Sequence, residues 1–133
     1  MRTGTIELPD PVGPYLTARY SLLLVVPETG RFHQIRRHLQ HIAHPVIGDK
    51  VHGDSAHNRF FSDVFNCRRL LLAAVQLVFN HPYTGRKTSI HAALDPAFSR
   101  VIHSFAWHPV LPLQTKDYKV PLHLPARILS REL

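Results

Sequence analysis

An amphipathic helix, bounded on both sides by residues that break helices, is the feature that most restricts the fold of this sequence. Its apolar positions recur at helical spacing and are Phe32, Ile35, Leu39, Ile42 and Ala43. They fall within an arc of about 100° if each residue advances about 100° around the axis. A Pro-Glu-Thr-Gly turn precedes the segment and Pro45 ends it. The sequence therefore predicts a helix over 32–43 that packs through one face.

Apolar runs before and after this helix are typical of strands that a sheet buries on both faces. Residues 17–26 and 69–79 each end in a run of large apolar side chains. A short strand is expected over 4–8, and a strand returning after a turn is expected over 87–92. These segments predict a mostly antiparallel or mixed sheet.

Local signals place further helices. A short helix is expected over 59–65, and residues 46–59 before it are expected to be a loop. Asp95 and Pro96 begin a last helix, because Asp is a favourable N-cap and Pro suits the first helical position. The fold class is therefore expected to be α+β, with two or three helices.

The length of 133 residues suits a single domain covering 1–133. Within it, residues 107–133 are expected to form an extended tail on the surface. The residues that favour this tail are Pro109, Pro112, Pro121 and Pro125.

The charge balance favours a polyanionic partner. Lys and Arg number 16 against 9 Asp and Glu, which gives a formal net charge of +7. The single cysteine, Cys67, excludes an internal disulfide framework and indicates a reducing compartment. No apolar run reaches the roughly 18 residues of a spanning helix, and the N-terminus lacks a signal-peptide core. We therefore expect a cytoplasmic protein without a membrane partner.

Two adjacent arginines fall on different sides of the predicted helix. With Phe32 at the origin, Arg36 lies at about 40°, on the edge of the apolar face, and Arg37 at about 140°, in solvent. An arginine at a core edge needs a carboxylate or several acceptors. Arg36 could therefore form a structural ion pair, snorkel to the surface, or orient a catalytic carboxylate. On the exposed flank, basic and polar residues favour phosphate binding, although a merely solvated face is the alternative.

Other chemistries find weaker support. His38, His41 and His44 lie three apart, but they form no metal-binding pattern with a nearby carboxylate, so no metal is expected. A histidine-rich metal protein is kept as a rival that elemental analysis would reveal. Some aromatic side chains could stack on a base, although such residues more often belong to a core; they are Tyr20, Phe32 and Trp107.

Several motifs resemble those of the RluA-type pseudouridine synthases. Residues 29–38 read T-G-R-F-H-Q-I-R-R-H and residues 44–49 read H-P-V-I-G-D, which is similar to the family signature G-R-x-H-Q-I-R-x-H…H-P-I-x-G-D. Residues 52–61 are similar to the branch of the family that acts on tRNA. The stretches 70–74 and 81–85 resemble a later strand and turn of the family.

The resemblance implies isomerisation of uridine to pseudouridine in RNA, without a cofactor or a metal. In the family an aspartate attacks the nucleoside, the glycosidic bond breaks, and the base rotates and is rejoined through C5, after the nucleotide has been flipped into the pocket. The arginine of H-Q-I-R, here Arg36, pairs with that aspartate. Leu72 would help to form the pocket wall. The candidate RNA-binding residues are Arg31, His33, Gln34, Arg37, Lys50, His52, His57, Asn58 and Arg59.

The sequence also departs from the family pattern. The family carries its nucleophile in an H-R-L-D-x-x-T-S-G motif, and no aspartate of this chain has that context. The chain therefore resembles the C-terminal half of a catalytic domain, so we treat 1–133 as a partial domain that is inactive alone. Its expected partners are RNA, most simply tRNA, and either the missing N-terminal half or a self-associating copy. A non-catalytic RNA-binding remnant of the fold is the alternative.

This interpretation makes a specific structural prediction for Arg36. Its side chain should point into an open cleft that contains no acidic partner from residues 1–133. A carboxylate of its own chain, such as Asp49 or Asp54, would instead make Arg36 part of a structural ion pair.

Overall fold

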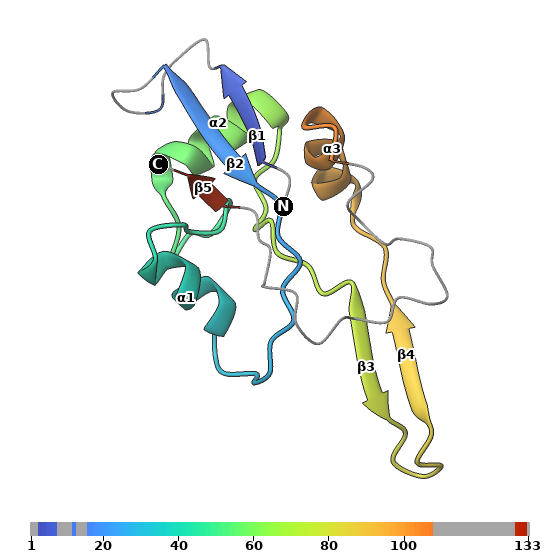
Figure 1. The fold of residues 1–133 in the computed structure, drawn as a ribbon. Helices are drawn as coiled ribbons and strands as arrows, with labels where there is room; N and C mark the ends of the chain where they lie inside the picture. The colour runs from blue at the N-terminus through green and yellow to red at the C-terminus, as the bar shows by residue number, and fades with distance from the viewer. Residues whose placement is uncertain (1–2, 8–11, 13–15, 108–129, 133) are drawn as a thin grey trace.

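The computed structural model describes residues 3–7, 12, 16–107 and 130–132. These residues form helices and antiparallel strands (Figure 1). The α+β class is confirmed. In chain order the elements are β1 (Thr3–Glu7), β2 (Thr17–Ser21), α1 (Gln34–His41), α2 (Ser55–Phe65), β3 (Gln76–Asn80), β4 (Lys87–His91), α3 (Pro96–Ser104) and β5 (Ser130–Glu132).

The strands form two separate antiparallel sheets. In the first, β2 lies between β1 and β5, and Thr3 pairs with Ser21. In the second, β3 and β4 form a hairpin in which Gln76 pairs with His91 and Asn80 with Lys87. The hairpin extends away from the other elements (Figure 1). Of the expected strands, 4–8 and 87–92 correspond to β1 and β4.

The core lies where β2 meets α2 and α3. Tyr20 from β2 and Phe61 from α2 are fully buried with their rings 4.8 Å apart, edge to face. Trp107 follows α3 and stacks on Phe105 at 4.3 Å. Tyr20 and Trp107 are therefore core residues rather than surfaces for a base. The hydroxyl of Tyr20 lies 2.7 Å from Nδ1 of His57, which pairs the two buried polar groups.

Side-chain caps set where two helices begin. Asp95 accepts hydrogen bonds from the backbone N–H groups of Ala97 and Phe98, so α3 begins as predicted. The helix expected over 59–65 instead begins at Ser55. The reason is local: Asp54 caps it by accepting from the N–H groups of the second and third residues after it.

The two long strands predicted from apolar runs are shorter in the structure. The first ends at Ser21, and residues 22–26 pair with no strand in the part of the chain that is described. The second is confined to β3, because the residues before it bond elsewhere. Leu71 donates its N–H to the carbonyl of Ile47 at 2.8 Å, which ties this stretch to the loop after α1.

Apolar side chains are exposed along the hairpin. Leu77 is 59% exposed and Ile90 51%, while Tyr83 at the turn is 93% exposed. Exposed apolar strands favour association, so the expected self-associating copy stays a prediction. Most of the predicted tail over 107–133 lies outside the described residues. None of the described helices is long and apolar enough to cross a membrane.

Candidate functional site

Arg36 and Asp49 form a bidentate ion pair between α1 and the loop that follows it. The guanidinium Nε donates to Oδ2 of Asp49 at 2.6 Å, and Nη2 donates to Oδ1 at 2.7 Å. The Asp49 side chain has no exposed surface, whereas Arg36 keeps 16% of its side chain exposed. The prediction that Arg36 lacks an acidic partner within the chain is therefore wrong, and the alternative, a structural ion pair with Asp49, is what the structure contains. Asp49 reaches Arg36 because the loop between α1 and α2 turns back toward α1.

The backbone around Asp49 is held from several directions. Its Oδ1 also accepts the N–H groups of Val51 and His52, at 2.9 and 2.8 Å. The Asn58 side chain accepts from the N–H of Gly48 at 2.6 Å and donates to the carbonyl of Asp49 at 2.8 Å. The carboxylate is thus fixed before any ligand arrives.

These contacts shift the ionisation of both partners. The hydrogen bonds from Arg36 hold the pKa of Asp49 well below its usual range, backbone N–H groups of His52 and Val51 add to this, and burial opposes it. The same hydrogen bond raises the pKa of Arg36. The pair is therefore ionised throughout the neutral range.

Arg36 retains donors beyond those that Asp49 uses. A guanidinium carries five N–H groups, and the pair engages Nε–H and one on Nη2. Among the described residues no hydrogen bond occupies the others. Asp49 therefore anchors Arg36 without using all of its N–H donors. The predicted contrast with Arg37 is confirmed, because Arg37 is exposed and Arg36 partly buried.

A chain of polar contacts links His33 to α1 through the loop. His33 Nδ1 lies 3.2 Å from His52 Nε2, and His52 Nδ1 lies 2.9 Å from Oε1 of Gln40. His33 precedes the helix in a left-handed conformation, with φ 51°. Burial, followed by the positive charge of Arg36, lowers the pKa of His33, so its ring is neutral at neutral pH.

The segment before α1 folds back on Gln34. Its Oε1 accepts from the hydroxyl of Thr29 at 2.7 Å and from the N–H of Arg31 at 2.9 Å. Gln34 therefore shapes this turn. Phe32, which the periodicity placed on the apolar face of the helix, lies outside the helix and is 80% exposed. The helix begins only at Gln34, after this turn, so Phe32 precedes the helical residues.

The candidate RNA-binding residues divide into two groups. The first group has exposed side chains and consists of Arg31, Arg37, Lys50 and Arg59; the second has partly or fully buried side chains and consists of His33, Gln34, His52, His57 and Asn58. His57 was expected on this surface, but that expectation is wrong: it is 2% exposed and faces Tyr20 inside the core. The cause is the early start of α2, which turns this residue inward. Asn58 is partly buried and holds the Asp49 loop.

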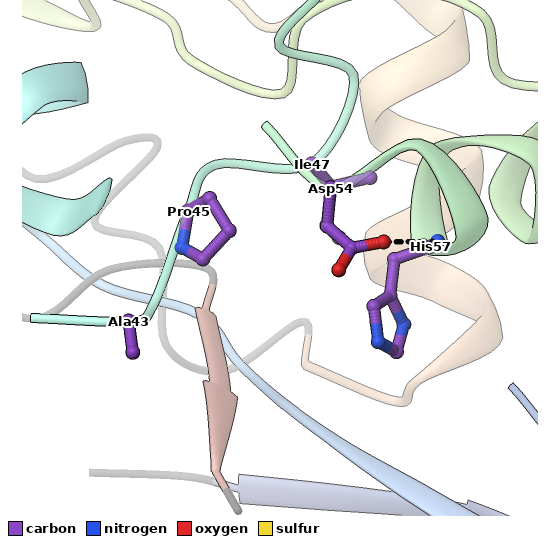
Figure 2. A pocket seen from close by; sticks show the side chains of 5 residues that line it. All are labelled: Ala43, Pro45, Ile47, Asp54 and His57. Carbon is purple, nitrogen blue, oxygen red and sulfur yellow. Dashed lines mark hydrogen bonds between the residues drawn. The ribbon is translucent and has the colours of Figure 1, made fainter. Parts of the chain in front are cut away.

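Two hollows lie near these residues. The first has a volume of about 50 Å³, and its walls are formed by Ala43, Pro45, Ile47, Asp54 and His57 (Figure 2). It is far below the roughly 300 Å³ at which small-molecule pockets begin. The second, of about 480 Å³, is an open surface hollow lined by Arg31, Phe32, Gln34, Arg37, His38, Gln40 and His41. Leu72, the predicted pocket wall, is half-buried and lines neither hollow.

Among the described residues there is no group of three or more His, Cys, Asp or Glu side chains that could hold a metal ion. Sequence reasoning gave Asp49 no role beyond that of a possible structural partner for Arg36. Its signal was the Gly-Asp pair that ends the 44–49 motif.

Curated relatives match most of this chain. It is 47% identical over 109 residues to tRNA pseudouridine synthase C of Salmonella typhi, a match covering 82% of this chain and 42% of the relative. It is 47% identical over 106 residues to the protein of that name from Pectobacterium carotovorum, covering 80% and 28%. For the Vibrio cholerae protein of that name the identity is 44% over 106 residues, covering 80% and 43%.

No family model matches the chain. The resemblance identified from the motifs is nevertheless confirmed by these relatives, although the chain spans less than half of the length of each. By sequence, the chain is a homologue of part of the tRNA pseudouridine synthase C proteins.

Proposed function

We propose that this chain is the C-terminal half of the catalytic domain of a tRNA pseudouridine synthase. Together with a polypeptide that carries the nucleophilic aspartate, it isomerises uridine to pseudouridine in RNA. The observation that carries the proposal is Arg36, which stands in the H-Q-I-R motif and has N–H donors left over from its pair with Asp49. The names of the relatives supply the reaction and the tRNA substrate.

In this proposal Asp49 is a positioning residue for Arg36. A free arginine side chain samples many rotamers, and ordering it costs conformational entropy. The two hydrogen bonds to Asp49 order the guanidinium in advance. Its remaining N–H groups then orient the nucleophilic carboxylate and keep it ionised, as a neighbouring cation does for any carboxyl group.

RNA is held by the exposed cations beside this pair. Arg31 and Arg37 border the 480 Å³ hollow, and Lys50 and Arg59 lie on the following loop and helix. The net charge of +7 supports an anionic partner. These cations contact the phosphates, so they position the RNA without selecting its sequence.

Replacing Arg36 by lysine should reduce activity far more than RNA affinity. The enzyme for this test is the chain joined to the part of the Salmonella typhi relative that the match leaves uncovered, because the chain alone should convert no uridine. An ammonium cannot reproduce a bidentate fork. We expect kcat/KM on unmodified tRNA to fall by about thirtyfold or more, the scale of a lost charged hydrogen bond.

Arg37→Lys is the matched control, since Arg37 is the exposed neighbour of Arg36, and it should retain most of the activity. The opposite ranking of the two variants would refute the assignment of Arg36. So would uridine conversion clearly above background by the chain alone.

RNA binding should weaken as salt rises. If Arg31, Arg37, Lys50 and Arg59 make about four phosphate contacts, the slope of log affinity against log salt should be about −3 to −4. Arg37→Ala should flatten this slope by about one unit, because one released counterion is lost. Fluorescence anisotropy with labelled tRNA over a salt series measures it. An unchanged slope would mean that Arg37 touches only solvent.

One observation favours the non-catalytic alternative. Arg36 already has a carboxylate partner within the chain, so the site is electrostatically satisfied without a nucleophile. A remnant that only binds RNA would keep the salt-dependent affinity. It would show no conversion when joined to the aspartate-bearing polypeptide, and this outcome separates the two functions.

A further inference from the structure

The most exposed large apolar side chain near the Arg36 site is Phe32, and it is already stacked on one face. Its ring is 80% exposed. The ring centroid lies 3.8 Å from that of His33, with 22° between the planes. His33 is held in turn by His52. The geometry is therefore that of an aromatic platform with one face supported and the other open.

The surroundings of Phe32 are basic and polar. It lines the 480 Å³ hollow together with Arg31 and Arg37, and the side chains that complete the lining are Gln34, His38, Gln40 and His41. No carboxylate belongs to this lining. A single exposed apolar residue on a protein surface is ordinary. An exposed ring flanked by two arginines, in a hollow without acidic groups, matches the pairing of stacking surface and phosphate contacts that binds single-stranded nucleic acid.

The neutral state of His33 fits the same role. Burial and the charge of Arg36 lower its pKa, so at neutral pH it supports Phe32 as an uncharged aromatic ring. The supporting ring is fixed from below by the contact of His33 with His52, whose other nitrogen meets Gln40. The platform is thereby tied to the loop that begins with Asp49.

We propose that Phe32 stacks on an unpaired base of the bound RNA, while Arg31 and Arg37 contact the phosphates on either side of that nucleotide. This inference rests on the proposed function, because it takes RNA as the ligand of this face. It adds a contact with a base to a surface that otherwise contacts only the phosphate backbone of the RNA. Stacking tolerates any base, so Phe32 selects single-stranded over paired RNA and not one sequence over another.

The test compares two probes with the full chain: a short single-stranded RNA and an abasic oligonucleotide of the same length and charge. Phe32→Ala should weaken binding of the base-bearing RNA about tenfold, the scale of one lost base stack. It should leave binding of the abasic probe unchanged. Arg37→Ala should weaken both probes equally. Phe32→Tyr should restore the affinity, because it keeps the stacking ring.

Ile42→Ala is the matched control. Ile42 is also a large exposed apolar residue, 58% exposed, at the other end of α1, and it lines neither hollow. Its replacement should change neither affinity. A second readout is Phe32→Trp, whose fluorescence should be quenched by the base-bearing probe alone. Trp107 is 2% exposed and should not respond.

Three results would overturn the proposal, and they are distinguishable. If Phe32→Ala leaves base-bearing affinity intact while Arg37→Ala weakens it, the chain binds RNA through this face but Phe32 does not stack. If Phe32→Ala changes the sedimentation of the chain and not its RNA affinity, Phe32 belongs to a protein interface. If the wild-type chain binds neither probe, the proposed function fails first, and this inference fails with it.

Discussion

Gly48→Ala should destabilise the chain by about 4 kcal/mol or more, near the limit of what single substitutions do. Gly48 has a φ of +79°, and a Cβ added there would lie 1.8 Å from the carbonyl oxygen of Arg69 and 2.9 Å from Cα of Leu70. The left-handed backbone alone costs about 1–2 kcal/mol. The contacted atoms are backbone and cannot rotate away, since Leu71 donates to Ile47 next to this contact.

Two other glycines separate the causes of this loss. Gly85 has a φ of +64° but open space around it, so Gly85→Ala should cost only the backbone strain of about 1–2 kcal/mol. Gly30 has open space and no such φ, so Gly30→Ala should change stability by less than about 0.5 kcal/mol. Urea unfolding followed by circular dichroism measures all three. Equal losses for Gly48→Ala and Gly85→Ala would show that Gly48 does not lie against the backbone of Arg69 and Leu70.

Asp49→Asn should lower the free energy of unfolding by about 3 kcal/mol at neutral pH, the cost of breaking a buried ion pair on one side. The substitution keeps the size of the side chain, and Oδ1 can still accept from the N–H groups of Val51 and His52. What it removes is the charge facing Arg36. Its amide N–H₂ group also faces guanidinium donors, so one of the two hydrogen bonds becomes a repulsive contact.

The same residue gives stability a defined dependence on pH. Folding lowers the pKa of Asp49 from its ordinary value of 3.8, so the folded state binds the proton only at a lower pH than the unfolded state does. Its contribution is therefore complete above about pH 5 and is lost as the pH falls through 4 and below, by up to about 1.4 kcal/mol per pH unit. In Asp49→Asn this part of the acid-induced loss should vanish.

Asp63→Asn serves as the matched control, because Asp63 is exposed on α2. It should leave both the stability at neutral pH and the acid dependence nearly unchanged. Equal pH profiles for wild type and Asp49→Asn between pH 5 and 3 would mean that Asp49 does not pair with Arg36 in solution.

The parts of the fold that the sequence predicted are those decided locally. Asp95 and Pro96 set the start of α3 through contacts within one helical turn. The edge position of Arg36 followed from helical period alone. The start of α2 was equally local, since Asp54 caps it, and it was missed because the flanking polar residues were interpreted as loop.

What the sequence did not predict depends on contacts between distant segments. The partner of Arg36 lies thirteen positions away across a loop, and its approach depends on Gly48 meeting the backbone of Arg69. The contact that His57 makes inside the core depends on Tyr20, which comes from a different element. Periodicity records which face of a helix is apolar, and it contains no information about where a loop returns.

The projecting β3–β4 hairpin gives the molecule two regions that can open independently. Among the helices and strands that the structure describes, β3 and β4 make substantial backbone contact only with each other, and the buried cluster around Tyr20 lies elsewhere. Opening the hairpin exposes little additional apolar surface, so its amide hydrogens can exchange with solvent through local fraying. Amides of α3 and β2 must await a larger opening. A single hydrogen–deuterium exchange experiment would therefore measure two processes: amides of the hairpin would report local opening, and amides of the core would report global unfolding.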